Sequence, residues 1–83
     1  MGVPDDKAVA EVEDAIRSHV AANPRAADTL QGIHDWWLPR RLRHRVTFEQ
    51  LQSAVDALAD AGLLEAREGL DGETLFLARR DPR

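Results

Sequence analysis

The second half of the chain constrains the fold most strongly, because it joins a helix with well-marked ends to two strand-like segments. Thr47 is a favoured N-cap residue, and Gln50 stands three positions later, as in a capping box. Gly62 stands where a helix commonly ends in the left-handed conformation. We therefore predict an amphipathic helix over residues 47–61. Its expected inner face comprises Leu51, Ala54, Val55, Leu58 and Ala61.

Two segments that alternate apolar and polar residues follow this helix. They cover residues 63–67 and 73–79, and such alternation is typical of half-buried β-strands. Asp71 and Gly72 lie between them and form a pair that is favoured in hairpin turns. The second half therefore predicts a helix followed by a β-hairpin. The residues expected on the core side of the hairpin are Leu63, Leu75 and Leu77.

A first helix is expected to start after Pro4, with Asp5 or Asp6 as its cap, and to stop at Asn23. Pro24 supports this end, because proline disfavours the α conformation in the residue that precedes it. The apolar stripe expected to face the core comprises Val9, Val12, Ile16 and Val20.

A second and shorter helix is expected to open at Asp28, where Gln31 has capping-box spacing, and to end at Pro39. The stripe expected to be buried comprises Leu30, Ile33 and Trp37. Residues 39–45 are then expected to form a loop with Leu42 as its single apolar anchor.

The predicted order is thus three helices followed by two strands. From Val46 to Leu64, the capped helix and the Gly-Leu-Leu that ends it are similar to the recognition helix and wing of the winged helix-turn-helix family. The resemblance covers roughly residues 8–79. It implies an α+β, mainly helical fold, a three-helix winged helix-turn-helix domain with a C-terminal β-hairpin wing. We accordingly predict a flexible N-terminus at residues 1–6, the domain at residues 7–79 and a tail at residues 80–83.

Negative charge is concentrated in the part of the chain that resembles a DNA reader. The whole chain has a net charge of −4, and residues 46–78 contain seven acidic residues and one arginine, a net charge of −6. On a DNA-binding winged helix, the outer face of this helix enters the major groove beside the phosphates. The outer residues here are Glu49, Gln50, Gln52, Ser53, Asp56 and Asp60. The amides and the hydroxyl can read base edges, whereas the flanking carboxylates of Glu49 and Asp56 would repel phosphates.

A basic island precedes this helix. Residues 36–45 contain no acid and four arginines, which are Arg40, Arg41, Arg43 and Arg45. These arginines can form a solvated patch or pair with acids elsewhere in the chain. They can also bind an anionic protein surface or the phosphates of a nucleic acid. The residue types leave these alternatives open.

The adjacent Trp36 and Trp37 cannot both face the core equally, because neighbouring helix positions point about 100° apart. Trp37 shares the face of Ile33, so we expect it in the core. Trp36 then lies at an edge beside the arginines. It either covers the core from the side or serves as an exposed anchor for a partner.

Sequence features of catalysis and metal binding are missing. The chain contains no cysteine, which excludes disulfides and cysteine-ligated zinc, and its three histidines lack metal-ligand spacing. It also lacks a Gly-rich phosphate loop and a nucleophile elbow. We therefore expect no enzymatic activity, no cofactor and no small-molecule substrate. Because no apolar run approaches roughly 18 residues and the N-terminus lacks a signal-peptide core, we expect a cytoplasmic protein without membrane contact.

Two hypotheses from different classes remain. The first is a small acidic protein-interaction module, an adaptor or assembly subunit that uses the acidic helix and hairpin or the edge around Trp36. The second is a DNA-binding transcriptional regulator that reads the major groove through helix 47–61. The family resemblance favours DNA and the charge distribution favours protein. We take protein binding as the expectation, and either hypothesis is compatible with a homodimer.

Overall fold

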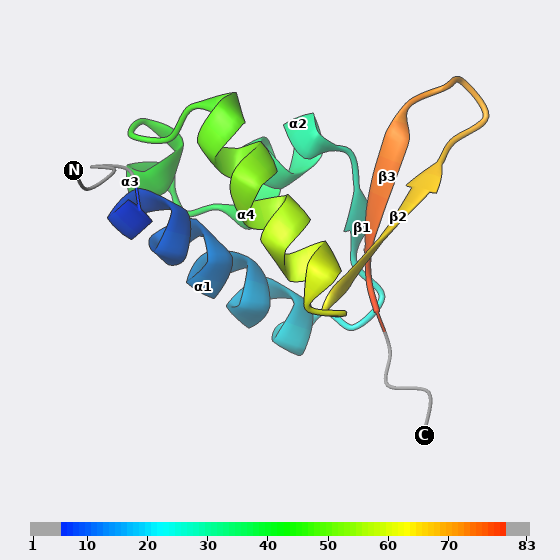
Figure 1. Cartoon of the computed structure of the whole chain (residues 1–83), viewed down its shortest axis with the longest axis horizontal. Helices are drawn as coiled ribbons and strands as arrows, with labels where there is room; N and C mark the ends of the chain where they lie inside the picture. The colour runs from blue at the N-terminus through cyan, green and yellow to red at the C-terminus, as the bar shows by residue number, and fades with distance from the viewer. Residues whose placement is uncertain (1–5, 80–83) are drawn as a thin grey trace.

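The computed structural model describes residues 6–79, which form a mainly helical α+β structure (Figure 1). The elements are α1 (Asp6–Ala22), β1 (Ala27–Asp28), α2 (Leu30–Gly32), the π-helix η1 (Ile33–Trp37), α3 (Arg40–Arg43), α4 (Phe48–Asp60), β2 (Leu64–Glu68) and β3 (Thr74–Ala78). The predicted fold class is therefore confirmed at the level of α+β. Apart from Asp6 at the start of α1, the predicted flexible N-terminus and the predicted tail lie outside the described residues.

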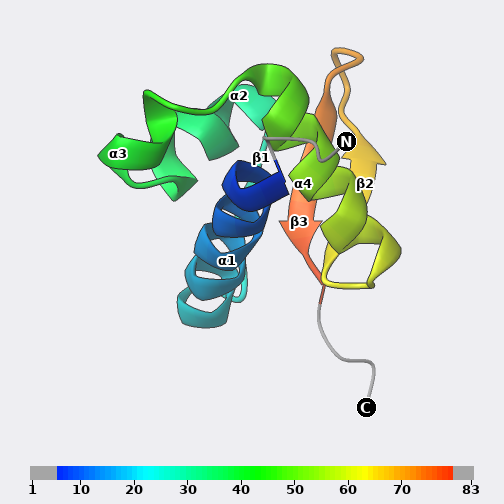
Figure 2. The same ribbon diagram turned by 60° about the vertical axis from the view of Figure 1, so that its left-hand side comes forward.

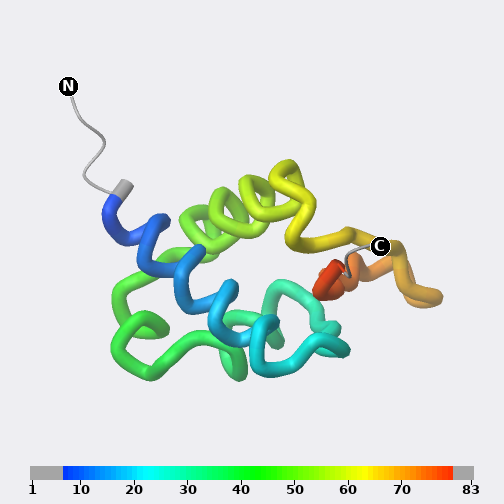
Figure 3. The backbone as a smooth tube through the Cα atoms, turned by 90° about the horizontal axis from the view of Figure 1, so that it is seen from below, coloured from blue at the N-terminus to red at the C-terminus, as the bar shows by residue number. Residues whose placement is uncertain are grey.

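The long helix α1 lies between α4 and the segment formed by η1 and α3 (Figure 3). It packs against α4 on one side and against η1 on the other. The antiparallel sheet has the strand order β1-β3-β2 and contacts α4 through β2. Figures 1 and 2 show the loop between β2 and β3 projecting at one end of the molecule, and α3 at the other. The two ends of the domain therefore present different surfaces.

α4 begins and ends where the sequence predicts. The Thr47 hydroxyl accepts a hydrogen bond from the Gln50 backbone N–H at 3.1 Å, and the Gln50 side-chain oxygen accepts one from the Thr47 N–H at 2.9 Å. At the other end, Gly62 has φ +85°, and the Leu63 N–H donates to the carbonyl oxygen of Leu58 at 2.9 Å. This bond is the long one of a Schellman motif. Both predicted caps are confirmed.

The N-cap gives a direct stability test. Replacing Thr47 by alanine removes the acceptor for the first turn of α4, so the free energy of unfolding should fall by about 0.5–2 kcal/mol. Thr47→Ser keeps a hydroxyl at this position and should stay near the parent. Urea denaturation followed by circular dichroism measures both variants. An unchanged midpoint for Thr47→Ala would show that the capping hydrogen bond contributes nothing.

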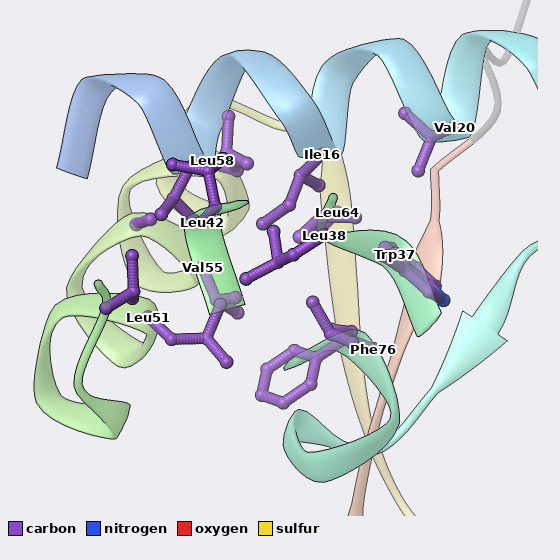
Figure 4. Close-up of a cluster of buried hydrophobic side chains, with 14 residues drawn as sticks. Ile16, Val20, Trp37, Leu38, Leu42, Leu51, Val55, Leu58, Leu64 and Phe76 are labelled. Atoms are coloured by element: carbon purple, nitrogen blue, oxygen red, sulfur yellow. The ribbon is translucent and has the colours of Figure 1, made fainter. Parts of the chain in front are cut away.

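The core joins α1, α4, the η1–α3 segment and one face of the sheet (Figure 4). Its buried residues are Val12, Ile16, Val20, Ile33, Trp37, Leu38, Leu42, Val46, Leu51, Ala54, Val55, Leu58, Leu64 and Phe76. The predicted stripes of α1 and α4 are largely confirmed by this set. Two positions differ, since Val9 is only partly buried and Ala61, at the end of α4, is exposed.

The predicted core face of the last strand is wrong. Phe76 is buried, whereas Leu75 and Leu77 on either side of it are half-buried on the opposite face of the sheet. The register pairs Phe76 with Ala66 and Leu64 with Ala78, which places Leu64 and Phe76 on the same core-facing side. Three consecutive large apolar residues fit either phase of a strand, and a shift of one residue exchanges the two faces.

The second helix starts one residue later than predicted, because Asp28 belongs to a strand that the sequence did not reveal. Ala27 and Asp28 pair with Leu77 and Phe76 as β1. Thr29 is the N-cap instead, and its hydroxyl accepts a hydrogen bond from the Gly32 N–H at 3.2 Å. Asp28 and Thr29 are both capping residue types, and a two-residue strand has no periodicity to detect.

The segment predicted as a loop contains a fourth helix. Within the described residues, α3 forms one turn after Pro39, whose carbonyl oxygen accepts hydrogen bonds from the N–H groups of Leu42 and Arg43. Leu42 is buried, as predicted, and anchors this turn in the core. The predicted three-helix count is therefore wrong, because a single turn with one apolar residue carries no helical repeat.

Candidate functional site

The two adjacent tryptophans have opposite environments. Trp37 is buried, with 6% of its surface exposed, and its ring stacks on the His19 ring with centroids 4.6 Å apart. Trp36 is 77% exposed at the end of η1. The prediction that Trp37 belongs to the core is confirmed. Trp36 lies outside the core, so the interpretation that it covers the core from the side is wrong.

The four arginines of the basic island divide into two groups. Arg43 is half-buried, and its Nη2 donates a hydrogen bond to the Leu38 carbonyl oxygen at 3.2 Å. Arg45 lies 3.8 Å from Glu11 of α1 in an ion pair. Arg40 and Arg41 are exposed and form no salt bridge with any residue in the range 6–79. The island therefore offers two available guanidinium groups rather than four.

His34 holds η1 against the end of α3. Its Nδ1–H donates to Asp35 Oδ1 at 2.9 Å, and its Nε2 lies 3.3 Å from the carbonyl oxygen of Arg43. This hydrogen bond from His34, together with bonds from the Gln31 amide, lowers the pKa of Asp35. A lowered folded-state pKa stabilises the structure at neutral pH, and the effect is lost as the pH falls through that pKa. The contacts to His34 and to the Leu38 carbonyl oxygen make Arg43 part of the packing between η1 and α3.

A shallow groove of about 670 Å³ runs between α1 and the η1–α3 segment. Ala15, Ser18 and Ala22 of α1 line one side, and Trp36 and Arg41 line the other. We call this surface the Trp36 groove. Its α1 side also includes the acidic residues Glu11 and Asp14, and its other side supplies an exposed aromatic ring with an exposed guanidinium. Arg40, also exposed, stands next to Arg41 on α3.

The outer face of α4 is polar and acidic. Glu49, Ser53 and Asp56 are exposed, and the Gln52 amide donates to Asp56 Oδ1 at 2.9 Å. Gln50 is half-buried and its side chain is held by the N-cap. Two of the candidate base-reading amides are thus already hydrogen-bonded within the helix.

This acidic face continues into the hairpin. A hollow of about 410 Å³ separates α4 from β3, and Gln52, Asp56 and Glu73 are among its lining residues. Asp56 and Glu73 thus face a common space, and no lysine or arginine within residues 6–79 lines it. A phosphate placed there would meet two carboxylates without a compensating cation.

The loop between β2 and β3 carries a residue that the sequence interpretation missed. Leu70 is fully exposed, and Glu68, Asp71 and Glu73 around it are exposed acids. We call these four residues the acidic wing tip, after the wing that the family resemblance implies. No periodicity marks Leu70, because it lies in a turn. The sequence offered one indication of its exposure, since Leu70 is a single large apolar residue among glycines and acidic residues.

Residues 6–79 contain no cluster of three His, Asp or Glu side chains that could hold a metal ion. None of the helices in this range is long and apolar enough to span a membrane. No protein-family model matches the chain, and no curated protein or solved structure gives a match.

Proposed function

We propose that the chain is a winged helix-turn-helix domain that binds protein rather than DNA. The order of elements supports this fold. The capped α4 leads through Gly62 directly into the antiparallel hairpin of β2 and β3, as the family resemblance implies. β1 adds a third strand beside β3, and α3 occupies the stretch before α4.

The charge of the face that would enter DNA supports a protein partner. Residues 46–78 bring a net charge of −6, and Asp56 and Glu73 line the hollow between α4 and the hairpin. Protein–DNA affinity depends largely on phosphate neutralisation, with roughly 6–10 phosphate contacts in a strongly salt-dependent complex. A surface with this charge repels the same phosphates.

The neighbouring arginines do not offset that repulsion. Arg43 is engaged with the backbone of Leu38, and Arg45 is paired with Glu11. Arg40 and Arg41 remain available and could neutralise about two phosphates. Two contacts would not outweigh the acidic residues of α4 and the hairpin.

Trp36 is the single observation that carries the proposal. It is 77% exposed at the end of η1 and lines a groove with Arg41, to which Arg40 is adjacent on α3. η1 lies on the opposite side of α1 from α4 (Figure 3). Tryptophan and arginine are the residue types most enriched in the energetic centres of protein interfaces. The exposed ring therefore marks a docking surface that is separate from the face a DNA reader would use.

Charge reversal on α4 tests this account of the acidic face. Glu49→Lys combined with Asp56→Lys should create weak binding to random duplex DNA that the parent lacks. Each new lysine–phosphate contact should steepen the dependence of log K on log salt by about 0.9. Fluorescence anisotropy with a labelled duplex at several salt concentrations measures both quantities.

The matched control places the same charge change on α1. Glu13→Lys combined with Asp14→Lys raises the net charge by the same amount, away from the outer face of α4. It should bind DNA more weakly than the α4 variant. Equal gains from both variants would show that α4 has no special geometry toward DNA, which contradicts the winged-helix proposal.

A further inference from the structure

The exposed large apolar residues of the described chain point to a contact between copies. They are Trp36, Phe48 and Leu70. Phe48 is 44% exposed and lies against the His34 ring, with centroids 5.0 Å apart, so it is partly accommodated within the molecule. Trp36 and Leu70 are the most exposed of the three. Each has a distinct charged neighbourhood.

Among the Asp, Glu and Arg side chains that line the Trp36 groove, only Arg41 lacks an ion-pair partner in residues 6–79. Two acids lie on its α1 side, but both are compensated within the chain. Glu11 is paired with Arg45 at 3.8 Å, and Asp14 is paired with Arg17 at 3.1 Å. Arg40 and Arg41 have no such partner in residues 6–79. An occupant of the groove should therefore offer an apolar side chain to Trp36 and carboxylates to the two arginines.

The acidic wing tip has this chemistry. Leu70 is fully exposed, and Glu68, Asp71 and Glu73 form no salt bridge with the described residues. The loop is also well defined. The Gly69 N–H donates to the Glu73 carbonyl oxygen at 2.6 Å, and Asp71 Oδ1 accepts from the Glu73 N–H at 3.1 Å. A preformed loop loses less conformational freedom when it binds.

The two surfaces cannot meet within one molecule. Figures 1 and 2 both place α3 at one end of the domain and the loop between β2 and β3 at the other. The longest dimension of the domain is 38 Å. A contact between them therefore requires a second molecule.

We propose that the Trp36 groove binds the acidic wing tip of a second copy of this chain. The inference rests on the proposed function, since it names the occupant of the same docking surface. Leu70 packs on the Trp36 ring, and the carboxylates of the wing tip face Arg40 and Arg41. The contact joins two different surfaces, so it can build two kinds of assembly. Two copies can form a closed dimer in which each wing tip occupies the groove of the other copy, or the copies can join head to tail in an open chain.

Self-association of the full chain tests the proposal. Sedimentation equilibrium from micromolar to millimolar concentration should show an average mass that rises above that of the monomer. The tryptophan fluorescence of the chain should shift to the blue over the same range, because association removes the exposed Trp36 ring from water, whereas Trp37 is already buried. Trp36→Ala and Leu70→Ser should each weaken association by about tenfold or more, as expected for central interface residues.

Charge exchange identifies the two surfaces. Arg41→Glu makes the groove acidic, and Asp71→Arg adds a positive charge to the wing tip, so neither variant should associate with itself. In a mixture, the unchanged groove of the Asp71→Arg variant meets the unchanged wing tip of the Arg41→Glu variant, so pairs of the two variants should form. Asp60→Arg, the same change at the exposed end of α4, should associate like the parent.

Either of two results would overturn the proposal. A parent that remains monomeric at millimolar concentration, or a mixture of Arg41→Glu and Asp71→Arg that fails to associate, rules out the second copy as the occupant. With duplex DNA still unbound, the groove would then belong to a different protein and the proposed function would stand. Binding of the parent to DNA would instead overturn the proposed function itself.

Discussion

Replacing Trp37 by alanine is expected to lower the free energy of unfolding by about 3–5 kcal/mol, the range for loss of a buried large aromatic side chain. Trp37 is 6% exposed in the core and stacks on His19. Removing its indole leaves a cavity between α1 and η1 that the backbone cannot fully close. For a domain of this size, such a loss is a large share of the total stability.

The neighbouring tryptophan is the matched control for this prediction. Trp36→Ala removes the same side chain from a site that is 77% exposed, so the free energy of unfolding should stay within about 0.5 kcal/mol of the parent's value. Urea denaturation at low protein concentration, followed by far-ultraviolet circular dichroism, measures both variants. Equal losses for the two variants would show that the η1 geometry is wrong, since that geometry separates the two rings.

Leu58→Ala is the second substitution with a large expected effect. Leu58 is 1% exposed at the centre of the contact between α4 and the rest of the core, and its carbonyl oxygen accepts the Leu63 N–H at the end of α4. Truncating a buried leucine should lower the free energy of unfolding by about 2–5 kcal/mol. The width of this energy range reflects how far the neighbouring side chains can move into the cavity that the substitution leaves.

Leu70→Ala is the corresponding control, because it makes the same truncation at a fully exposed leucine. Its free energy of unfolding should stay within about 0.5 kcal/mol of the parent. The same urea titration compares the two variants. A Leu58→Ala variant with an unmoved midpoint would mean that α4 does not pack on the core in the way described.

The fold was predictable where a local rule and the hydrophobic repeat agree. Thr47, Gln50 and Gly62 each have a residue type that suits one helix position, and the structure uses all three in that way. The failures occur where the repeat is absent or ambiguous. β1 and α3 are too short to show a period. The run from Leu75 to Leu77 fits both strand phases, and the burial of Phe76 in the core decides between them.

The candidate site was predictable as a set of residue types but not as a geometry. The sequence shows four arginines together, and only the folded contacts reveal that Arg43 and Arg45 are engaged. Helical geometry predicted that the two tryptophans would differ, and the structure shows Trp37 inside. Leu70 could not be singled out, because its importance depends on full exposure at the end of a projecting hairpin.

Binding of the unmodified chain to duplex DNA distinguishes a protein-binding domain from a DNA-binding one. A pool of random duplexes should be passed through repeated selection on the immobilised protein near physiological salt, and the selected duplexes titrated by anisotropy. We expect no enriched sequence and negligible affinity, because residues 46–78, which include α4 and the hairpin, carry a net charge of −6 that repels the phosphates. Sub-micromolar binding to a specific duplex that is lost on Arg41→Ala or Gln50→Ala would contradict this expectation.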